Sequence, residues 1–333
     1  MTMSGAVVCF GEALGRLSTE PGQHLLGFAN RLELHVGGAE LNVAAALAGF
    51  GLRTTMVTAF PDNPLGDRAL VHLRSFGIDT SAVVRGEGRL GLYFVDTGAS
   101  QRVSRVTYDR ANSVFAAYDW SGHAWQQALD GAAALHVSGI TLAVSANACS
   151  AAFDAMRAAR ETGVMVSFDA NFRPALWAGR EADGATAFAE ALALSDLAFV
   201  DHRDAAMVLG SSSGVPVEVT ALFDACPHLT RIAHTYRRAE SVGIQHLAAR
   251  FVTRAGQDVT TEEVRIADVV DRIGSGDAFA AGVLHAILCN DKAADIAQTG
   301  LAAACLKHSQ RGDALAATAE DLRGFWTQSD VRR

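Results

Sequence analysis

The chain has 333 residues, half of them hydrophobic and 19% charged, and its 28 basic and 36 acidic residues give a formal net charge of −8. This composition is typical of a globular protein with one large α/β domain, or with one domain and an appendage, and it argues against disorder. A nucleic-acid partner is not expected, because the sequence has no basic surplus or basic stripe.

The five cysteines lie far apart in the sequence and form no C-x-x-C pair, which is typical of unpaired thiols in a reducing cytosol. No apolar run approaches 18 residues, and residues 1–10 have no basic segment ahead of their apolar run. We therefore expect a cytoplasmic protein with no membrane partner.

Short apolar runs alternate along the chain with segments of helical spacing. Strands are predicted at residues 6–10, 54–60, 133–140, 164–171, 197–201 and 230–236. Helices are predicted at residues 39–50, 64–76, 147–162, 182–194, 204–209 and 278–288. This alternation indicates an α/β fold with a mostly parallel sheet covered on both faces. In such sheets the ligand lies beyond the carboxyl ends of the strands.

Residues 14–35 and 85–112 break the alternation and contain no good helix. The second stretch includes "LGLYFVDTG" and "SRVTYDR", which alternate like exposed hairpin strands. We predict that the two stretches form a small β-lid on a single domain spanning residues 1–333. A lone two-stranded ribbon is marginal in water, so the lid is expected to pair with its copy in a homodimer or higher homo-oligomer.

The stretch "DRIGSGDAFAAG" (271–282) places Gly274, Ser275, Gly276 and Asp277 at the start of an apolar helix. Glycines let a phosphate approach the free N–H groups of a helix start. A carboxylate there can accept the proton of a hydroxyl that attacks phosphorus. The alternative is that Asp277 only caps the helix. The stretch lacks the Gly-Lys-Ser/Thr ending of a P-loop and does not follow the first strand, which argues against a dinucleotide fold.

Two further stretches complete a pattern. "GGAELNVAAALAGFG" (37–51) opens a helix with two glycines, and "VSFDANFRPALW" (166–177) presents polar residues at the end of a strand. Together with the glycine-rich stretch, they resemble the ribokinase-like (PfkB) family of carbohydrate kinases over nearly the whole chain. The resemblance implies a three-layer α/β/α sandwich with a central, mostly parallel sheet and a β-lid.

The resemblance also implies site residues and ligands. It places Gly37, Gly38 and Asn42 at the sugar. It places the phosphates of ATP over Gly274, Ser275 and Gly276, with Asp277 as the general base and Mg²⁺ on the phosphates.

Within that family, the chain is most similar to the 2-keto-3-deoxygluconate kinases. "VTYDRANSVFAAY" resembles their Y-x-R element, which implies that Tyr108 and Arg110 bind the substrate, together with Tyr93 from the preceding lid strand. "DANFRPALW" likewise implies a substrate contact for Arg173. Two arginines suit a sugar acid, because a guanidinium grips a carboxylate bidentately. The alternatives are a solvated lid charge for Arg110 and a salt bridge to Asp169 for Arg173.

The chain departs from the family pattern on the phosphate side. Where the family has N-x-x-E this chain has Asp201-His202-Arg203-Asp204, so Asp201 and Asp204 are candidates for holding metal-bound water. The alternative is an acidic helix start. Arg237 is expected to replace the usual phosphate-side lysine, and Arg272 stands where the family has a small residue.

"CLKHSQRGD" (305–313) resembles a segment that flanks the nucleotide base, which implies that position for Lys307 and His308. The alternative is that both are surface residues. Activation by a monovalent cation, which occurs in parts of the family, would involve Asp271.

The resemblance implies ATP-dependent phosphorylation of the primary hydroxyl of 2-keto-3-deoxygluconate, giving 2-keto-3-deoxy-6-phosphogluconate. Three alternatives remain open. The substrate is the galactonate epimer, or a neutral sugar as in a fructokinase or ribokinase, or the protein is a catalytically silent sugar-acid sensor.

Overall fold

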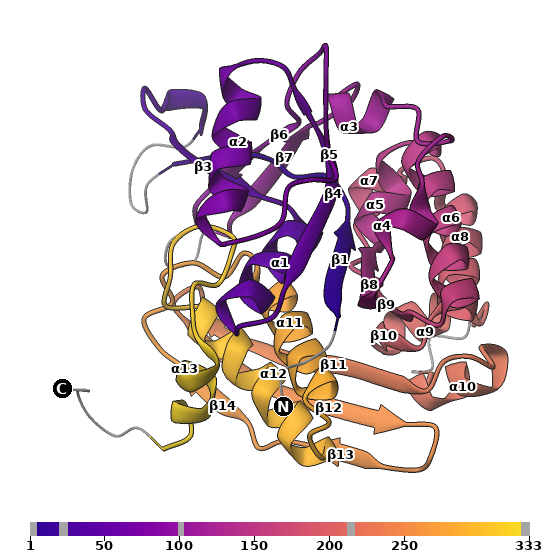
Figure 1. The fold of residues 1–333 in the computed structure, drawn as a ribbon. Coiled ribbons are helices and arrows are strands. Elements are labelled where there is room, and N and C mark those ends of the chain that lie inside the picture. Colours follow the sequence, from indigo (N-terminus) through magenta and orange to yellow (C-terminus); the bar gives the residue numbers. More distant parts are fainter. Residues whose placement is uncertain (1–4, 20–25, 99–102, 212–216, 328–333) are drawn as a thin grey trace.

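A computed structural model of the chain describes residues 5–19, 26–98, 103–211 and 217–327 (Figure 1). Within these residues, ten strands form the main sheet: β1 (Ala6–Phe10), β4 (Thr54–Pro61), β5 (Val83–Gly86), β8 (Ala132–Ser138), β9 (Met165–Asp169), β10 (Leu197–Phe199), β11 (Arg231–Ser241), β12 (Ile244–Thr253), β13 (Asp258–Thr260) and β14 (Val264–Ile266). Their order is β13-β12-β11-β10-β9-β8-β1-β4-β5, with β14 also paired to β12.

The strands from β11 to β5 run parallel, whereas β12 is antiparallel to β11, β13 and β14. The central strands are short and apolar because helices cover both of their faces, so that nearly every side chain is buried. The predicted mostly parallel sheet is confirmed, and each of the six predicted strands is present. β5 and the antiparallel strands β12, β13 and β14 were not predicted.

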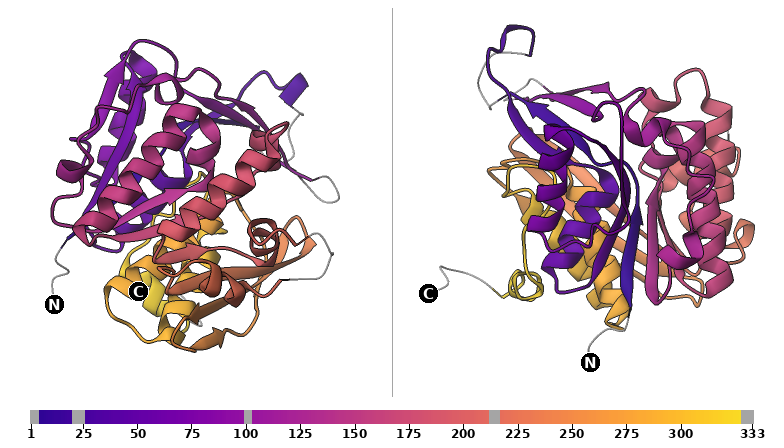
Figure 2. Two further views of the ribbon diagram at one scale, coloured as in Figure 1. Left: turned by 90° about the vertical axis from the view of Figure 1, so that its right-hand side faces the viewer. Right: turned by 45° about the horizontal axis from the view of Figure 1, so that its top comes forward.

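Helices cover the sheet on both faces, which confirms the three-layer architecture (Figures 1 and 2). One face carries α1 (Ala39–Gly49), α2 (Pro64–Ser75), α11 (Ser275–Leu288), α12 (Ala293–Lys307) and α13 (Ala319–Gly324). The other carries α3 (Val114–Ala117), α4 (Trp125–Ala128), α5 (Gly139–Val144), α6 (Ala146–Thr162), α7 (Pro174–Trp177), α8 (Glu181–Leu194), α9 (His202–Val208) and α10 (Leu222–Ala225). Two short 3-10 helices lie at Leu26–Phe28 and Val219–Ala221.

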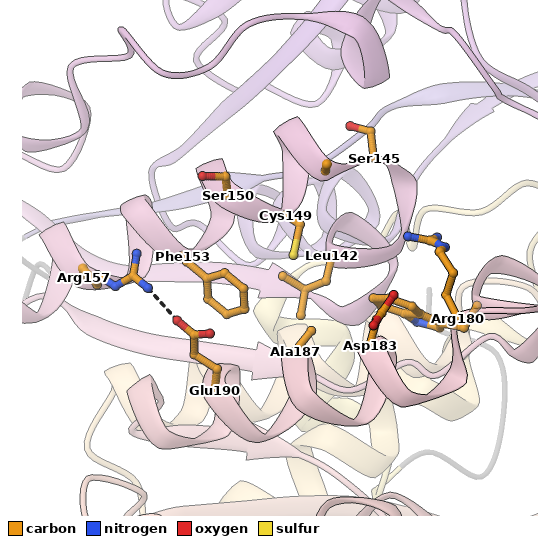
Figure 3. A pocket seen from close by; sticks show the side chains of 12 residues that line it. Leu142, Ser145, Cys149, Ser150, Phe153, Arg157, Arg180, Asp183, Ala187 and Glu190 are labelled. Atoms are coloured by element: carbon orange, nitrogen blue, oxygen red, sulfur yellow. Dashed lines mark hydrogen bonds and ion pairs between the residues drawn. The ribbon is translucent and has the colours of Figure 1, made fainter.

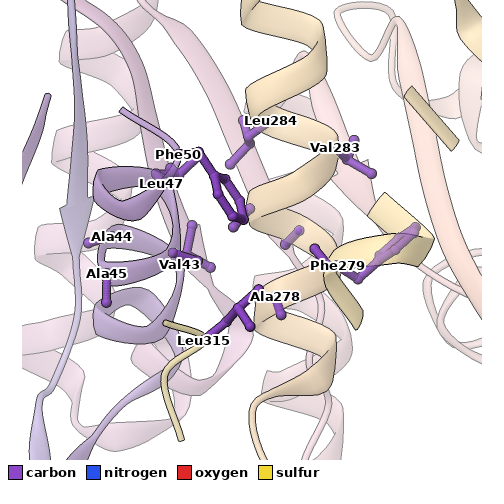
Figure 4. Packing of buried hydrophobic residues seen from close by; sticks show 14 of the residues in the cluster. Val43, Ala44, Ala45, Leu47, Phe50, Ala278, Phe279, Val283, Leu284 and Leu315 are labelled. Carbon is purple, nitrogen blue, oxygen red and sulfur yellow. The ribbon is translucent and has the colours of Figure 1, made fainter. Parts of the chain in front are cut away.

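Helices α1 and α11 pack against each other in the first of these layers (Figure 4). Val43 and Leu47 of α1 lie in the same buried cluster as Ala278 and Leu284 of α11. Many of the buried positions on both helices are alanines, which let two helices approach closely. The packing brings together the first turns of two helices that are more than 230 residues apart in the chain.

A second sheet has four strands in the order β3-β2-β6-β7, namely β2 (Leu14–Ser18), β3 (Glu33–Gly37), β6 (Leu92–Asp96) and β7 (Arg105–Asp109). It corrects the expectation of a two-stranded ribbon, because β2 pairs in parallel with β6 and joins the two predicted stretches into one sheet. Residues 85 and 86, assigned to this lid from the sequence, belong to β5 of the main sheet.

Two further expectations concern the cysteines and the membrane. All five cysteines are free thiols, as predicted. Among the residues that the structure describes, no helix has the length and apolar character needed to cross a membrane.

Candidate active site

Acidic side chains gather at the carboxyl edge of the main sheet. Glu12 follows β1, Asp169 ends β9, and Asp201 follows β10, and these parallel strands end at the same edge. Burial raises the pKa of Asp169 to about 8, and the nearby Asp277 carboxylate raises it further. The first turn of α11 therefore lies beside this edge of the sheet.

Asn42 and Asp277 form the central contact of the site. The Asn42 Nδ2 group donates a hydrogen bond of 2.6 Å to Asp277 Oδ2. Both side chains are buried, with 3% and 8% of their surface exposed. The glycine-pair helix and the glycine-rich motif, which the sequence analysis assigned to one site, are thus brought together.

Burial raises the pKa of Asp277 to about 7, although the hydrogen bond from Asn42 and the charge of Arg173 act in the opposite direction. Its side chain does not cap α11, because Gly274 is the N-cap residue and no side chain makes a capping hydrogen bond. The capping alternative for Asp277 is therefore wrong. A carboxyl group with a pKa near 7 can exchange a proton readily at neutral pH.

The start of α11 leaves backbone donors free. Gly274 has φ of +82°, a left-handed conformation, and a Cβ atom there would overlap the carbonyl oxygen of Asp313. The Ser275 N–H group donates to the Arg272 carbonyl at 3.3 Å. Within the described part of the chain, the N–H groups of Gly276 and Asp277 have no acceptor. These two donors, with the positive end of the helix dipole, suit an anion.

Three arginines without an ion-pair partner among the described residues lie near this helix start. Partial desolvation, and the repulsion of Arg272, Arg173 and Arg203, lower the pKa of the Arg237 guanidinium. Of these four residues, only Arg203 forms an ion pair, with Asp201. Arg173, Arg237 and Arg272 thus form an uncompensated positive cluster, which suits a polyphosphate or another polyanion.

The predicted sugar-side glycines lie at the join between β3 and α1. Gly37 ends β3 and Gly38 is the N-cap of α1. A Cβ atom on Gly37 would overlap the Asp313 carboxylate, to which the hydroxyl of Tyr93 donates a hydrogen bond. Tyr93 from the second sheet and the glycine pair therefore meet at Asp313.

Arg16 and Asp313 are functional candidates that the sequence analysis missed. The Arg16 guanidinium on β2 pairs with Asp313 Oδ1 at 2.8 Å and with Asp271 Oδ2 at 2.7 Å. Ile273 packs against the small apolar cluster that includes Tyr93. The second sheet thus contacts the glycine-rich motif through both an ion-pair network and an apolar contact. No local pattern marks Arg16 or Asp313, because their partners are distant in sequence.

The Y-x-R element lies on the second sheet. Tyr93 and Tyr108 face each other across β6 and β7, with ring centroids 6.3 Å apart, and the Arg110 guanidinium lies 6.0 Å from the Tyr108 centroid. Arg110 Nε and Nη2 contact Glu12 Oε2 at 2.7 and 2.5 Å, and the hydroxyl of Ser113 donates to the same carboxylate. Arg110 is 8% exposed, so the alternative of a solvated charge is wrong.

Arg173 lies at the carboxyl end of β9, where it is the exposed N-cap residue of α7. Its charge lowers the pKa of both Asp169 and Asp277. The alternative of a salt bridge to Asp169 is not observed among the described residues. Arg173 therefore reaches the site electrostatically with its guanidinium unpaired.

Asp201 and Asp204 form a capping box at the start of α9. Asp201 Oδ1 accepts from the Arg203 and Asp204 N–H groups at 2.7 and 3.1 Å, and Asp204 Oδ2 accepts from the Asp201 N–H group at 2.9 Å. This is the arrangement expected of the acidic helix-start alternative. Burial raises the pKa of Asp204 to about 6.

The carboxylates of Asp169, Asp204 and Asp277 repel one another electrostatically, as the raised pKa of Asp169 indicates. In the described chain, no three histidine, cysteine, aspartate or glutamate side chains lie close enough together to bind a metal by themselves. Mg²⁺ is commonly held by one or two carboxylates together with water and phosphate oxygens. The oxygen donors at this edge fit that mode of binding.

Lys307 and His308, at the end of α12, are both buried, so the alternative that they are surface residues is wrong. Lys307 Nζ donates to the Gln310 carbonyl at 2.9 Å, and His308 Nδ1 donates to the Ala304 carbonyl at 2.7 Å. Their position beside a nucleotide base stays a prediction.

A separate cavity of about 410 Å³ lies between α6 and α8 in the outer layer (Figure 3). It is lined by Cys149, Phe153, Arg157, Arg180 and Glu190, among others. None of the predicted site residues lines it, so it is distinct from the candidate active site.

Comparison with known proteins places this geometry in context. The pattern of the pfkB family carbohydrate kinases matches residues 5–320. A curated relative, the 2-dehydro-3-deoxygalactonokinase of Haloferax volcanii, is 29% identical and the match covers 96% of each chain. A crystal structure of a PfkB family carbohydrate kinase from Listeria grayi is 34% identical with a TM-score of 0.92, covering 97% of this chain and 100% of that one. A 2-dehydro-3-deoxygluconokinase structure from Thermotoga maritima is 33% identical with a TM-score of 0.90 and the same coverage.

Proposed function

The chain belongs to the pfkB family of carbohydrate kinases, and on this premise we propose that it transfers the γ-phosphoryl group of ATP to the primary hydroxyl of 2-keto-3-deoxygluconate. The product is 2-keto-3-deoxy-6-phosphogluconate, and ADP leaves. One observation carries the proposal. The buried Asp277 carboxylate, held by Asn42, lies in the first turn of a helix whose N–H groups are free beside unpaired arginines.

Asp277 is the general base of this proposal. As the substrate oxygen attacks the γ-phosphorus, its proton passes to an Asp277 carboxylate oxygen, and the bond from phosphorus to the β-phosphate oxygen breaks in line. The Asn42 amide orients that carboxylate. A pKa of about 7 leaves a large ionised fraction at neutral pH and makes the carboxylate more basic than an exposed aspartate.

The phosphates are assigned to the start of α11. The backbone of Gly274, Ser275 and Gly276 forms the anion hole, and Arg237 and Arg272 supply positive charge beside it. Asp201 and Asp204, with Asp169 next to them, would hold Mg²⁺ through water. Bound there, Mg²⁺ would neutralise the charge that develops on the phosphate oxygens.

The sugar acid is assigned to the space between α1, the second sheet and β9. The residues proposed to contact it are Gly37, Gly38, Asn42, Tyr93, Tyr108, Arg110 and Arg173. The unpaired guanidinium of Arg173 supports recognition of a carboxylate. Arg110 is already neutralised by Glu12, so we assign it to the hydroxyl groups, to which it can donate without a full charge of its own.

A second candidate substrate is the galactonate epimer, 2-keto-3-deoxygalactonate, which the name of the Haloferax volcanii relative supports. The two substrates differ in the configuration of one hydroxyl. Measuring kcat/KM for both epimers with the same enzyme preparation separates the assignments. A preference for the gluconate epimer supports our first proposal, and a preference for the galactonate epimer replaces it.

Neutral sugars and a silent sensor are tested in the same way. ADP release is measured by a coupled assay with both sugar acids, fructose and ribose. Turnover with a sugar acid above that with fructose or ribose supports the proposal. Faster turnover with a neutral sugar contradicts the substrate class, and binding of a sugar acid without ADP release contradicts the kinase assignment.

We also propose that the protein works in the cytoplasm, where ATP is available, and as a homodimer through the second sheet. Support for the dimer comes from β7, an edge strand with mostly exposed side chains, on which Val106 is 42% exposed. Light scattering at micromolar concentration tests it, and a monomer would contradict it.

A further inference from the structure

Lys307 is a buried cation that the proposed chemistry does not use. The sequence contains only two lysines, Lys292 and Lys307, and its other 26 basic residues are arginines. Lys292 is an exposed N-cap residue at the start of α12, whereas Lys307, the last residue of the same helix, is fully buried. Burying a charged ammonium is costly unless polar groups compensate it.

Backbone oxygens provide that compensation. Lys307 Nζ donates to the Gln310 carbonyl at 2.9 Å and to the Asp271 carbonyl at 3.4 Å. In the described chain, no carboxylate lies within ion-pair distance of Nζ, although Asp271 and Asp313 are close enough to favour its charged form. An ammonium held by carbonyl oxygens resembles the way carbonyl oxygens hold a desolvated monovalent cation.

The two carbonyls belong to the segments that build the start of α11. Asp271 opens the glycine-rich loop, and all of its polar groups are engaged. Its N–H group donates to the His308 carbonyl at 3.4 Å, its Oδ1 accepts from the Ile273 N–H group at 3.0 Å, and its Oδ2 pairs with Arg16. Lys307 holds the remaining oxygen, the carbonyl.

Gln310 belongs to the facing segment, residues 308–313, which also touches the loop directly. The Val270 N–H group donates to the His308 carbonyl at 2.8 Å, and the Asp313 carbonyl lies against Gly274, where no Cβ would fit. By binding one carbonyl from each segment, the ammonium fixes the position of the N-cap of α11 relative to the rest of the protein.

We propose that Lys307 is a positioning residue, a built-in cation that holds the glycine-rich loop in the geometry needed to receive the phosphates. The inference rests on the proposed kinase function for its catalytic consequence, but not for its structural one. A lysine suits this place better than an arginine, because the compact ammonium can sit between two carbonyls that a planar guanidinium would push apart.

Three variants test the proposal: K307M, K307A and the matched control K292M on the same helix. Methionine fills much of the space of lysine without the charge, so we expect K307M to fold with a melting temperature near that of the wild type. We expect its kcat to fall about 10- to 100-fold, as for a small displacement of a phosphate-binding group, with little change in KM for the sugar. K292M should be unaffected. An unfolded K307M, or one with wild-type kcat, would overturn the proposal.

Chemical rescue distinguishes a cation from simple packing. At constant ionic strength, K⁺ or NH₄⁺ should restore part of the activity of K307A, in which the space is open, and none of that of K307M, in which it is filled. Wild-type activity should not depend on K⁺ or NH₄⁺. A K307A variant that neither ion restores, or a wild type that requires one, contradicts the role assigned to Lys307.

Hydrogen exchange provides a readout that does not depend on the substrate assignment. The amides of Val270 and Asp271 donate to His308 and should exchange faster in K307M than in the wild type or K292M. If exchange is unchanged, the positioning role is wrong even if the kinase assignment is right. If exchange rises but no sugar is phosphorylated by the wild type, only the kinase assignment fails.

Discussion

The Asn42 amide donates to the Asp277 carboxylate at 2.6 Å, across 235 positions of the sequence and between two helices that pack closely. This contact joins the glycine-pair helix to the glycine-rich motif, and it is the single hydrogen bond that a side chain makes to the proposed base within the described residues. Because it stabilises the ionised form, it sets how far the buried carboxylate departs from an ordinary aspartate.

Replacing Asn42 should therefore change the pH dependence of the reaction. In N42A the pKa of Asp277 rises further, since the hydrogen bond that lowers it is lost. The acidic limb of kcat/KM should move to higher pH than in the wild type. A pH–rate profile measures this, with N147A, an exposed amide on α6, as the control. An acidic limb at the same pH in N42A and the wild type would separate Asn42 from the base.

The raised pKa of Asp277 also predicts how stability depends on pH. The folded state holds the proton up to about pH 7, whereas the unfolded state releases it near 3.8. The folded state binds more protons between these values, so this group's contribution to stability is present below pH 3.8 and is lost as the pH rises through about 7. D277N lacks this loss.

Urea unfolding at several pH values measures the effect. The free energy of unfolding of D277N should rise relative to that of the wild type from about pH 4 to pH 7, and the difference should then level off. A D277N variant that becomes less stable than the wild type over this interval would mean that Asp277 is ionised and well solvated in the folded protein.

The two glycines of the motif should respond differently to the same substitution. Gly274 has a positive φ and lies against the Asp313 carbonyl, so G274A should lower the free energy of unfolding by about 1–3 kcal/mol or more. The added methyl of G276A meets no atom within 4 Å, so this variant should fold normally. It should nevertheless raise KM for ATP, because the methyl occupies the space proposed for phosphate. Equal stability of the two variants would contradict the geometry of the loop.

Arg173 should distinguish a sugar acid from a neutral sugar. Loss of one charged hydrogen bond costs about 1.5–3 kcal/mol, so R173M should raise KM for the sugar acid about 10- to 100-fold. The control is R157M, on the outer layer, where Arg157 pairs with Glu190 (Figure 3). Steady-state kinetics with both variants decide the point, and an R173M variant with the KM of R157M would remove Arg173 from the site.

The parallel part of the fold could be predicted because its strands are buried on both faces and so appear as continuous apolar runs. The antiparallel strand β12 escaped prediction because "IQHLAARFVT" mixes polar and apolar residues, as a strand near the sheet edge can. The parallel pairing of β2 with β6 was missed for another reason. It joins segments that are more than 70 residues apart, and no local pattern specifies such a pairing.

The site was predictable where short motifs specify it and not where side chains meet across the fold. Asn42 and Asp277 lie in motifs, and they were found. Arg16 and Asp313 are 297 positions apart, and each is an ordinary charged residue in its own segment. Burial of Lys307 was equally invisible, because a helix-terminal lysine is usually exposed. Contacts of this kind require the folded arrangement.

The central claim is that Asp277 is the general base of a sugar-acid kinase, and the turnover of D277N tests it most directly. Asparagine can still accept the hydrogen bond from Asn42 but cannot take a proton from the substrate, so fold and ligand binding should be preserved. With ATP and 2-keto-3-deoxygluconate, we predict that kcat falls by about 10²- to 10⁴-fold while the affinity for ATP stays near that of the wild type. Near-normal turnover in D277N would contradict the account.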